Sequence, residues 1–78
     1  MPDPSADYAK DDLRQAAAQA RAYAEAARAL VDFHRAHAAH VMGEKRHVAL
    51  AMMEAHKLMA THADKLTLLY EREFASCP

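Results

Sequence analysis

Histidine is the most distinctive chemical component of this chain, because six histidines occur among 78 residues. His37 and His40 are three residues apart, His47 follows seven residues later, and Glu44 lies between the last two. Imidazole and carboxylate groups that share a helix face, or converge on a turn, can bind zinc, nickel, cobalt or copper. We expect a solvated polar turn that carries these histidines without a metal. The alternative is a transition-metal site formed by His37, His40, Glu44 and His47.

A row of arginines is the second distinctive feature, and its members lie seven residues apart: Arg14, Arg21, Arg28 and Arg35. On a helix the row is about 31 Å long and could follow nucleic-acid phosphates. In architecture this resembles the small RNA-binding helical bundles of the Rop type. Asp11, Glu25 and Asp32 lie close enough to pair with these arginines, and a net charge of −1 is unlike that of a nucleic-acid binder. We therefore expect a salt-bridged flank, with RNA or DNA binding as a minor alternative.

An apolar stripe with a seven-residue repeat must position these side chains. It consists of Leu13, Ala20, Ala27, His34 and Val41, with Ala17, Ala24, Val31 and Ala38 in the intermediate positions. A repeat of this kind keeps one face of an α-helix directed at a partner helix. Because most members are alanines, we expect the two helix backbones to approach each other closely.

The helix-breaking residues define the boundaries of the predicted elements. Prolines occur at positions 2, 4 and 78, and Gly43 is the only glycine. Asp3 and Pro4 resemble a helix cap followed by proline in the first helical position. We predict a helix over about 4–42, a turn at about 43–44 with Gly43 ending the first helix, and a helix over about 45–75. The whole chain, residues 1–78, is then one all-α domain, a two-helix antiparallel hairpin.

The alternative fold is one long helix in a parallel coiled coil. The seven-residue series continues through the glycine without a shift of phase, as Val41, Val48, Ala55, His62 and Leu69. A glycine within a helix costs only about 1 kcal/mol relative to alanine. Against this alternative, Lys45 and Glu73 would occupy positions in the apolar seam, so the hairpin is favoured.

The second half of the chain is apolar over a broader face than the first. We expect its packing stripe to be Val48, Met52, Ala55, Met59, His62, Leu66 and Leu69, widened by Leu50, Met53, Leu58 and Leu68. In the hairpin, His34 lies level with Met52, and His62 lies level with Tyr23. Each histidine is expected to fix the helix register as a hydrogen-bonded polar group. The alternative is that protonation near pH 6 loosens the bundle.

Length and composition favour self-association. A chain of 78 residues buries only about 60% of its unfolded surface, and alanine adds little to a core. A dimeric four-helix bundle is the expected remedy. Cys77 is the single cysteine, which excludes an internal disulfide, and no signal peptide or bilayer-spanning stretch is expected. A cytoplasmic location without membrane contact is the resulting expectation.

No catalytic signature is present, so we expect no enzyme activity. The sequence predicts a self-associating helical interaction module, such as an adaptor, a chaperone-like protein or a regulatory protein. Its partners would be a second copy and another protein, and no cofactor is expected unless the histidine cluster binds a metal. The residues expected to form the interface are Leu13, Ala20, Ala27, Leu30, Val31, Val41, Val48, Met52, Met59, Leu66 and Leu69.

Overall fold

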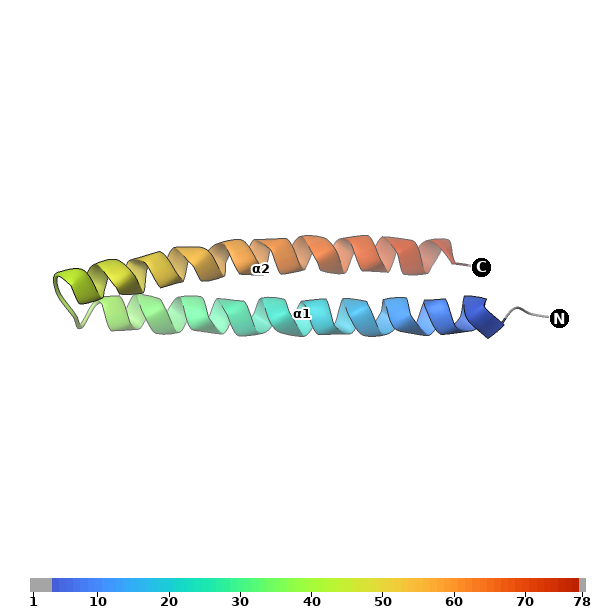
Figure 1. Cartoon of the computed structure of the whole chain (residues 1–78), viewed down its shortest axis with the longest axis horizontal. Coiled ribbons are helices and arrows are strands. Elements are labelled where there is room, and N and C mark those ends of the chain that lie inside the picture. The colour runs from blue at the N-terminus through green and yellow to red at the C-terminus, as the bar shows by residue number, and fades with distance from the viewer. Residues whose placement is uncertain (1–3, 78) are drawn as a thin grey trace.

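Two long helices folded back on each other make up the structure, a computed structural model that describes residues 4–77 and their side chains from residue 9 onward (Figure 1). Helix α1 spans Pro4–Ala38 and helix α2 spans Glu44–Ser76. The helices run antiparallel, with the turn at one end and Pro4 and Ser76 at the other, in a rod of 65 × 13 × 13 Å. The predicted helical hairpin is confirmed, and the single long helix is wrong. Within the described residues, neither helix has an apolar stretch long enough to cross a membrane.

Helix α1 begins at Pro4, as predicted, but ends at Ala38 rather than near Met42. The expected cap, Asp3, lies outside the described residues. After Ala38 the backbone hydrogen bonds change from spanning four residues to spanning three. The amide of His40 donates to the carbonyl of His37 at 2.9 Å. Packed helix axes lie about 8–10 Å apart, and here residues 39–43 make the connection between them. Residues 39–42 therefore leave the helix, although the helical pattern of the sequence continues through them.

Gly43 marks the start of α2, which corrects the prediction that it ends α1. Its backbone has φ 63° and ψ −134°, and its carbonyl accepts a hydrogen bond from the amide of His47 at 3.1 Å. The free carbonyl at the end of α1 is satisfied from the other helix, because Arg46 Nε donates to the Ala38 carbonyl at 3.0 Å. Gly43 and Arg46 together fix the chain reversal.

The core between the helices is built mainly from alanine. On α1 the predicted stripe is confirmed, since its buried members are Ala17, Ala20, Ala24, Ala27, Val31 and Ala38. On α2 the buried residues are Ala49, Met53, Ala60, Ala63 and Thr67. Ala24 has no exposed surface, whereas none of the large side chains described is fully buried. The core is therefore closely packed but thin.

The phase of the α2 core differs from the prediction by one residue. Val48 and Met52 were expected to pack against α1, but Ala49 and Met53 do so instead. A one-residue shift on a helix turns the packing stripe by about 100°. The alanine face of α1 allows a close approach, and Ala49, Ala60 and Ala63 match it better than valine, methionine and leucine would. The bulkier residues consequently lie beside the contact.

At the open end of the hairpin, opposite the turn, the aromatic ring of Phe74 joins the two helices. Lys10 Nζ lies 5.1 Å from the ring centroid, and Arg14 Cζ lies 5.2 Å from it. Both cations come from α1, whereas the ring comes from the last turns of α2. These cation–π contacts hold together the ends of the helices that are farthest from the turn.

Candidate interaction surface

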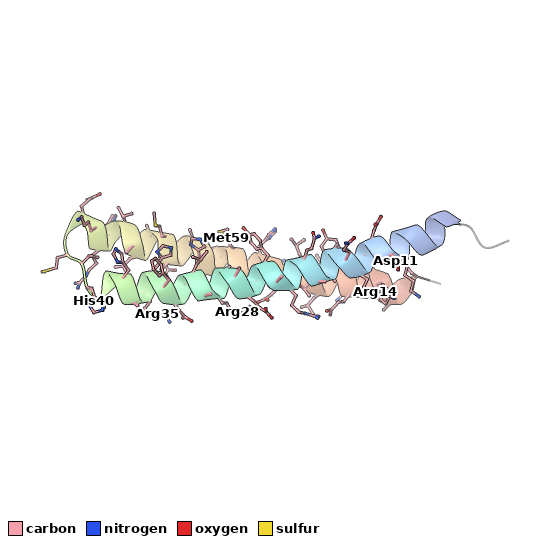
Figure 2. All side chains as sticks on the ribbon, turned by 90° about the horizontal axis from the view of Figure 1, so that it is seen from below. Asp11, Arg14, Arg28, Arg35, His40 and Met59 are labelled. Carbon is pink, nitrogen blue, oxygen red and sulfur yellow. The ribbon has the colours of Figure 1, made fainter. Side chains whose placement is uncertain are left out.

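The two sides of the helix pair differ in chemistry. One side, here called the charged flank, carries the arginine row of α1 and Lys57, Asp64 and Glu71 of α2. Figure 2 shows Arg28 and Arg35 along this edge and Met59 on the opposite edge. The opposite side is called the apolar flank. Its large side chains are Tyr23, Leu30 and Phe33 of α1 and Val48, Met52, Met59 and Leu66 of α2, together with Leu69, which lies seven residues after His62.

The apolar flank is exposed along its whole length. Tyr23 is 51% exposed, Met52 is 47% exposed and Leu69 is 46% exposed. Leu30 belongs to the same face because it lies seven residues from both Tyr23 and His37. Side chains larger than those of the core are thus presented to solvent in a continuous band.

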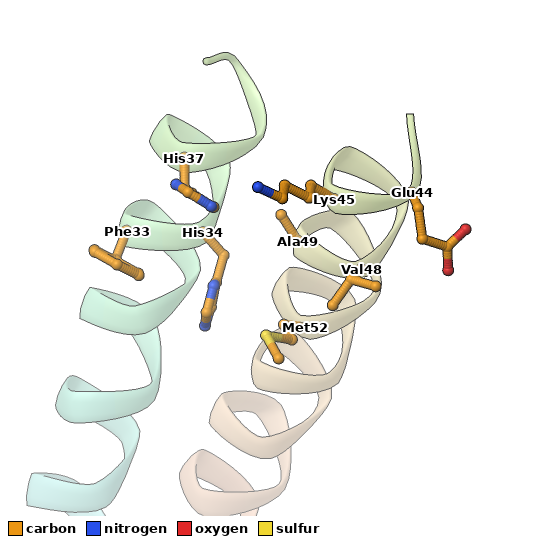
Figure 3. A pocket seen from close by; sticks show the side chains of 8 residues that line it. All are labelled: Phe33, His34, His37, Glu44, Lys45, Val48, Ala49 and Met52. Carbon is orange, nitrogen blue, oxygen red and sulfur yellow. The ribbon is translucent and has the colours of Figure 1, made fainter. Parts of the chain in front are cut away.

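A hollow near the turn is the first of two depressions in the apolar flank (Figure 3). This turn-side hollow has a volume of about 390 Å³, and its lining includes Phe33, His34, His37, Val48 and Met52. Figure 3 shows Lys45 reaching across it toward His37, whereas Glu44 points away. The turn-side hollow is therefore apolar at its base and basic at its rim.

A second hollow lies farther along the same flank. This open-side hollow has a volume of about 260 Å³ and is lined by Ala20, Tyr23, Met59, His62, Ala63 and Leu66. Its lining confirms that His62 lies level with Tyr23. The turn-side hollow likewise confirms that His34 lies level with Met52. Two hollows flanked by exposed apolar side chains form a surface that can accept the ridges of another helix.

The histidines beside the apolar flank interact with aromatic rings and with the backbone. The ring of His37 stacks on Phe33 with centroids 6.2 Å apart. His34 is half-buried, and its ring centroid lies 5.2 Å from that of His56. Nδ1 of His56 lies 2.8 Å from the Met52 carbonyl, so that nitrogen donates a hydrogen bond when it carries the proton. The structure gives His34 ring contacts with Phe33 and His56 in place of the predicted hydrogen bond.

The residues of the predicted metal site are not gathered into one cluster. His37 and Glu44 border the turn-side hollow, but Glu44 points away from it. His40 lies in the connection and His47 in the first turn of α2, and both are exposed. Among the described residues, no group of three or more His, Cys, Asp or Glu side chains is arranged to hold a metal ion.

The arginine row is paired with carboxylates. Arg14 lies 4.0 Å from Asp11 and Arg35 lies 3.2 Å from Asp32, as the spacing along the helix predicts. The two central arginines instead pair across the helices. Arg28 contacts Asp64 at 3.1 Å, and Arg21 contacts Glu71. The charged flank is therefore a seam between α1 and α2.

The sequence analysis did not identify Asp64, Glu71 or Arg46 as structural partners. A signal for the first two was present, because Asp64 and Glu71 are seven residues apart, as Arg21 and Arg28 are. In an antiparallel pair, two such rows come into register. The contact of Arg46 with Ala38 had no signal in the spacing, because it depends on the path of the connection.

The predicted interface residues occupy three environments. Ala20, Ala27 and Val31 are buried between the helices. Leu13, Val41 and Leu66 are partly exposed. The remaining five lie on the apolar flank and are exposed: Leu30, Val48, Met52, Met59 and Leu69. The hairpin by itself covers only part of the apolar surface that the sequence provides.

Comparison with known proteins gives no further indication of function. No protein-family model, curated protein or solved structure matches the chain.

Proposed function

We propose that the protein is a non-catalytic helical interaction module that self-associates through its apolar flank. The observation that supports this proposal is the distribution of apolar side chains. Alanines fill most of the contact between α1 and α2, whereas the apolar flank exposes larger side chains beside it, namely Tyr23, Leu30, Met52, Met59 and Leu69. A soluble chain that presents such a band generally uses it to bind a partner.

Energetics favour covering this band. A fully buried leucine or methionine side chain contributes about 1.5–3 kcal/mol, and an alanine contributes much less. Met52 and Leu69 are each about half exposed. Covering them would add roughly 1 kcal/mol apiece. Two hairpins joined by their apolar flanks form a four-helix bundle, in which each helix is packed on two neighbours.

The test is sedimentation equilibrium of the untagged protein across a concentration series. Met59→Glu places a carboxylate at the centre of the apolar flank, so we expect this variant to be monomeric. Leu58→Glu is the matched control, because Leu58 is 73% exposed and points away from both flanks. We expect the unaltered protein and the Leu58→Glu variant to be dimers.

Two results would count against the proposal. One is a monomer throughout the concentration series, and the other is equal dissociation of both variants. Native mass spectrometry of the same samples reports bound metal together with the subunit number. Stoichiometric metal that is lost from a His40→Ala, His47→Ala variant would favour the metal-binding alternative instead.

A further inference from the structure

The apolar flank carries opposite charges at its two ends. One row of α2 reads Lys45, Met52, Met59, Leu66 and Glu73, each seven residues from the next. Lys45 lies at the turn end and Glu73 at the open end, and both are exposed. Neither takes part in the ion pairs formed by residues 9–77. The row is therefore an apolar strip with a free cation at one end and a free anion at the other.

Helix α1 adds a second carboxylate at the open end of the same flank. Asp12 lies in the row of Phe33, three seven-residue steps before it, and is exposed near the open end. His37 lies beside Lys45 at the turn end, where both border the turn-side hollow. The open end of the flank is thus acidic on both helices, and the turn end carries the lysine and the imidazole.

We propose that a second copy of the chain docks on the apolar flank in the antiparallel orientation, with the two turns at opposite ends of the bundle. Lys45 of each copy then pairs with the partner's Glu73. This inference rests on the self-association proposed above and specifies its geometry. The two copies are related by a two-fold axis that passes near Met59 and runs across the hairpin.

The spacing of the apolar residues fits the same axis. Lys45 and Glu73 each lie 14 residues from Met59, about 21 Å along the helix, so both charge contacts form together. Met52 then faces the partner's Leu66, and Met59 faces the partner's Met59. On α1, Tyr23 and Leu30 are equally far from a centre midway between Ala26 and Ala27.

The centres on the two helices lie at the same height. Tyr23 lies one turn from Ala26, and it lines the open-side hollow together with Met59. One two-fold axis can therefore pass through the centre of the apolar residues on both α1 and α2. The orientation with both turns at one end has no such fit. It would bring Lys45 of both copies to one end of the bundle, and Asp12 and Glu73 of both copies to the other end, which disfavours it.

Disulfide trapping distinguishes the two orientations. In a Cys77→Ser background, Lys45→Cys and Glu73→Cys chains are oxidised separately and as a mixture. The antiparallel dimer predicts a covalent dimer in the mixture alone, because residues 45 and 73 of one helix are about 42 Å apart. A covalent dimer in the Lys45→Cys sample alone would overturn the antiparallel orientation.

Charge reversal tests the contact without new cysteines. We expect Lys45→Glu and Glu73→Lys each to weaken the dimer about tenfold, because two attractive contacts become repulsive. The double variant restores the charge pairs and should return to within about twofold of the original dissociation constant. Lys65→Glu is the control, because it changes the net charge equally on the outward row of α2.

The outcomes separate this inference from the proposed function. A dimer whose double variant is as weak as the single variants would overturn the antiparallel pairing and leave self-association intact. A monomer in all samples would overturn both.

Discussion

Arg28 on α1 donates hydrogen bonds from Nη1 to both carboxylate oxygens of Asp64 on α2, each at 3.1 Å. The contact of Arg21 with Glu71 lies seven residues away on both helices and repeats the same relationship. Two such contacts at a spacing of two helical turns fix both the register and the antiparallel direction of the hairpin. Their side chains are about half exposed, so their role is specificity more than stability.

The first prediction concerns this ion pair. Arg28→Asp should lower the free energy of unfolding by about 1 kcal/mol, because it places two carboxylates side by side. Exchanging the charges, with Arg28→Asp and Asp64→Arg together, should recover most of that loss. Urea unfolding at one fixed protein concentration measures the coupling, which we expect to shrink as salt is added.

The control is Arg35→Asp, because the partner of Arg35 is Asp32 on the same helix. Adding Asp64→Arg to this control should not rescue it. A rescue equal to that of the Arg28 variant would show that net charge, rather than the contact between Arg28 and Asp64, determines the effect.

A second prediction concerns the closest part of the helix contact. Ala24 has no exposed surface, so leucine at this position cannot be accommodated without separating the helices. Ala24→Leu should lower the free energy of unfolding by about 1–3 kcal/mol. Ala22→Leu introduces the same side chain on the exposed face of α1 and should be nearly neutral. Thermal unfolding followed by circular dichroism compares the two, and equal melting temperatures would contradict the close alanine contact.

The fold could be predicted from sequence because two strong signals agree. The alanine stripe of α1 specifies one packing face, and Gly43 interrupts an otherwise continuous helical pattern. The position of the stripe on α2 could not be predicted in the same way. That helix is apolar on several adjacent faces, so its periodicity allows either Val48 or Ala49 to face α1. The structure selects Ala49 because small residues fit the close contact.

For the candidate site, the sequence predicts which apolar residues take part but not which of them remain exposed. The sequence analysis named Met52, Met59 and Leu69 as packing residues, and the hairpin leaves them exposed on the apolar flank. The apolar residues of α2 that remain exposed are determined by which face of α2 packs against α1. An error of one residue in that face changes which of them are predicted to be buried. The predicted cluster of His37, His40 and His47 depended on the path of the connection, which local spacing does not define.

A third prediction concerns Arg46, which joins the start of α2 to the end of α1. Its Nε donates to the Ala38 carbonyl at 3.0 Å, and this carbonyl belongs to the last turn of α1. Arg46→Ala should lower the free energy of unfolding by about 1–2 kcal/mol, because the hydrogen bond is charge-assisted and partly buried. Arg72→Ala is the control, as an exposed arginine of the same helix. A loss no greater than that of the control would show that water replaces the Arg46 contact without cost.

The last prediction concerns the backbone at Gly43. Its φ of 63° and ψ of −134° form a combination that residues with a side chain avoid. A Cβ at this position would meet no atom within 4 Å, so substitution isolates backbone strain from crowding. Gly43→Ala should therefore lower the free energy of unfolding by about 1–3 kcal/mol, measured by urea unfolding.

D-alanine provides the decisive comparison for Gly43, and a chain of 78 residues can be made by chemical ligation. Mirror-image stereochemistry makes the backbone angles of Gly43 equivalent to an extended polyproline-like conformation, which a D-residue adopts without strain. D-alanine also restricts the unfolded chain, so we expect it to stabilise the hairpin by about 0.4–1 kcal/mol. Met42→Ala is the control for the adjacent, 80% exposed position and should have little effect. Equal destabilisation by the L- and D-residues would mean that the turn requires glycine for a reason other than its positive φ.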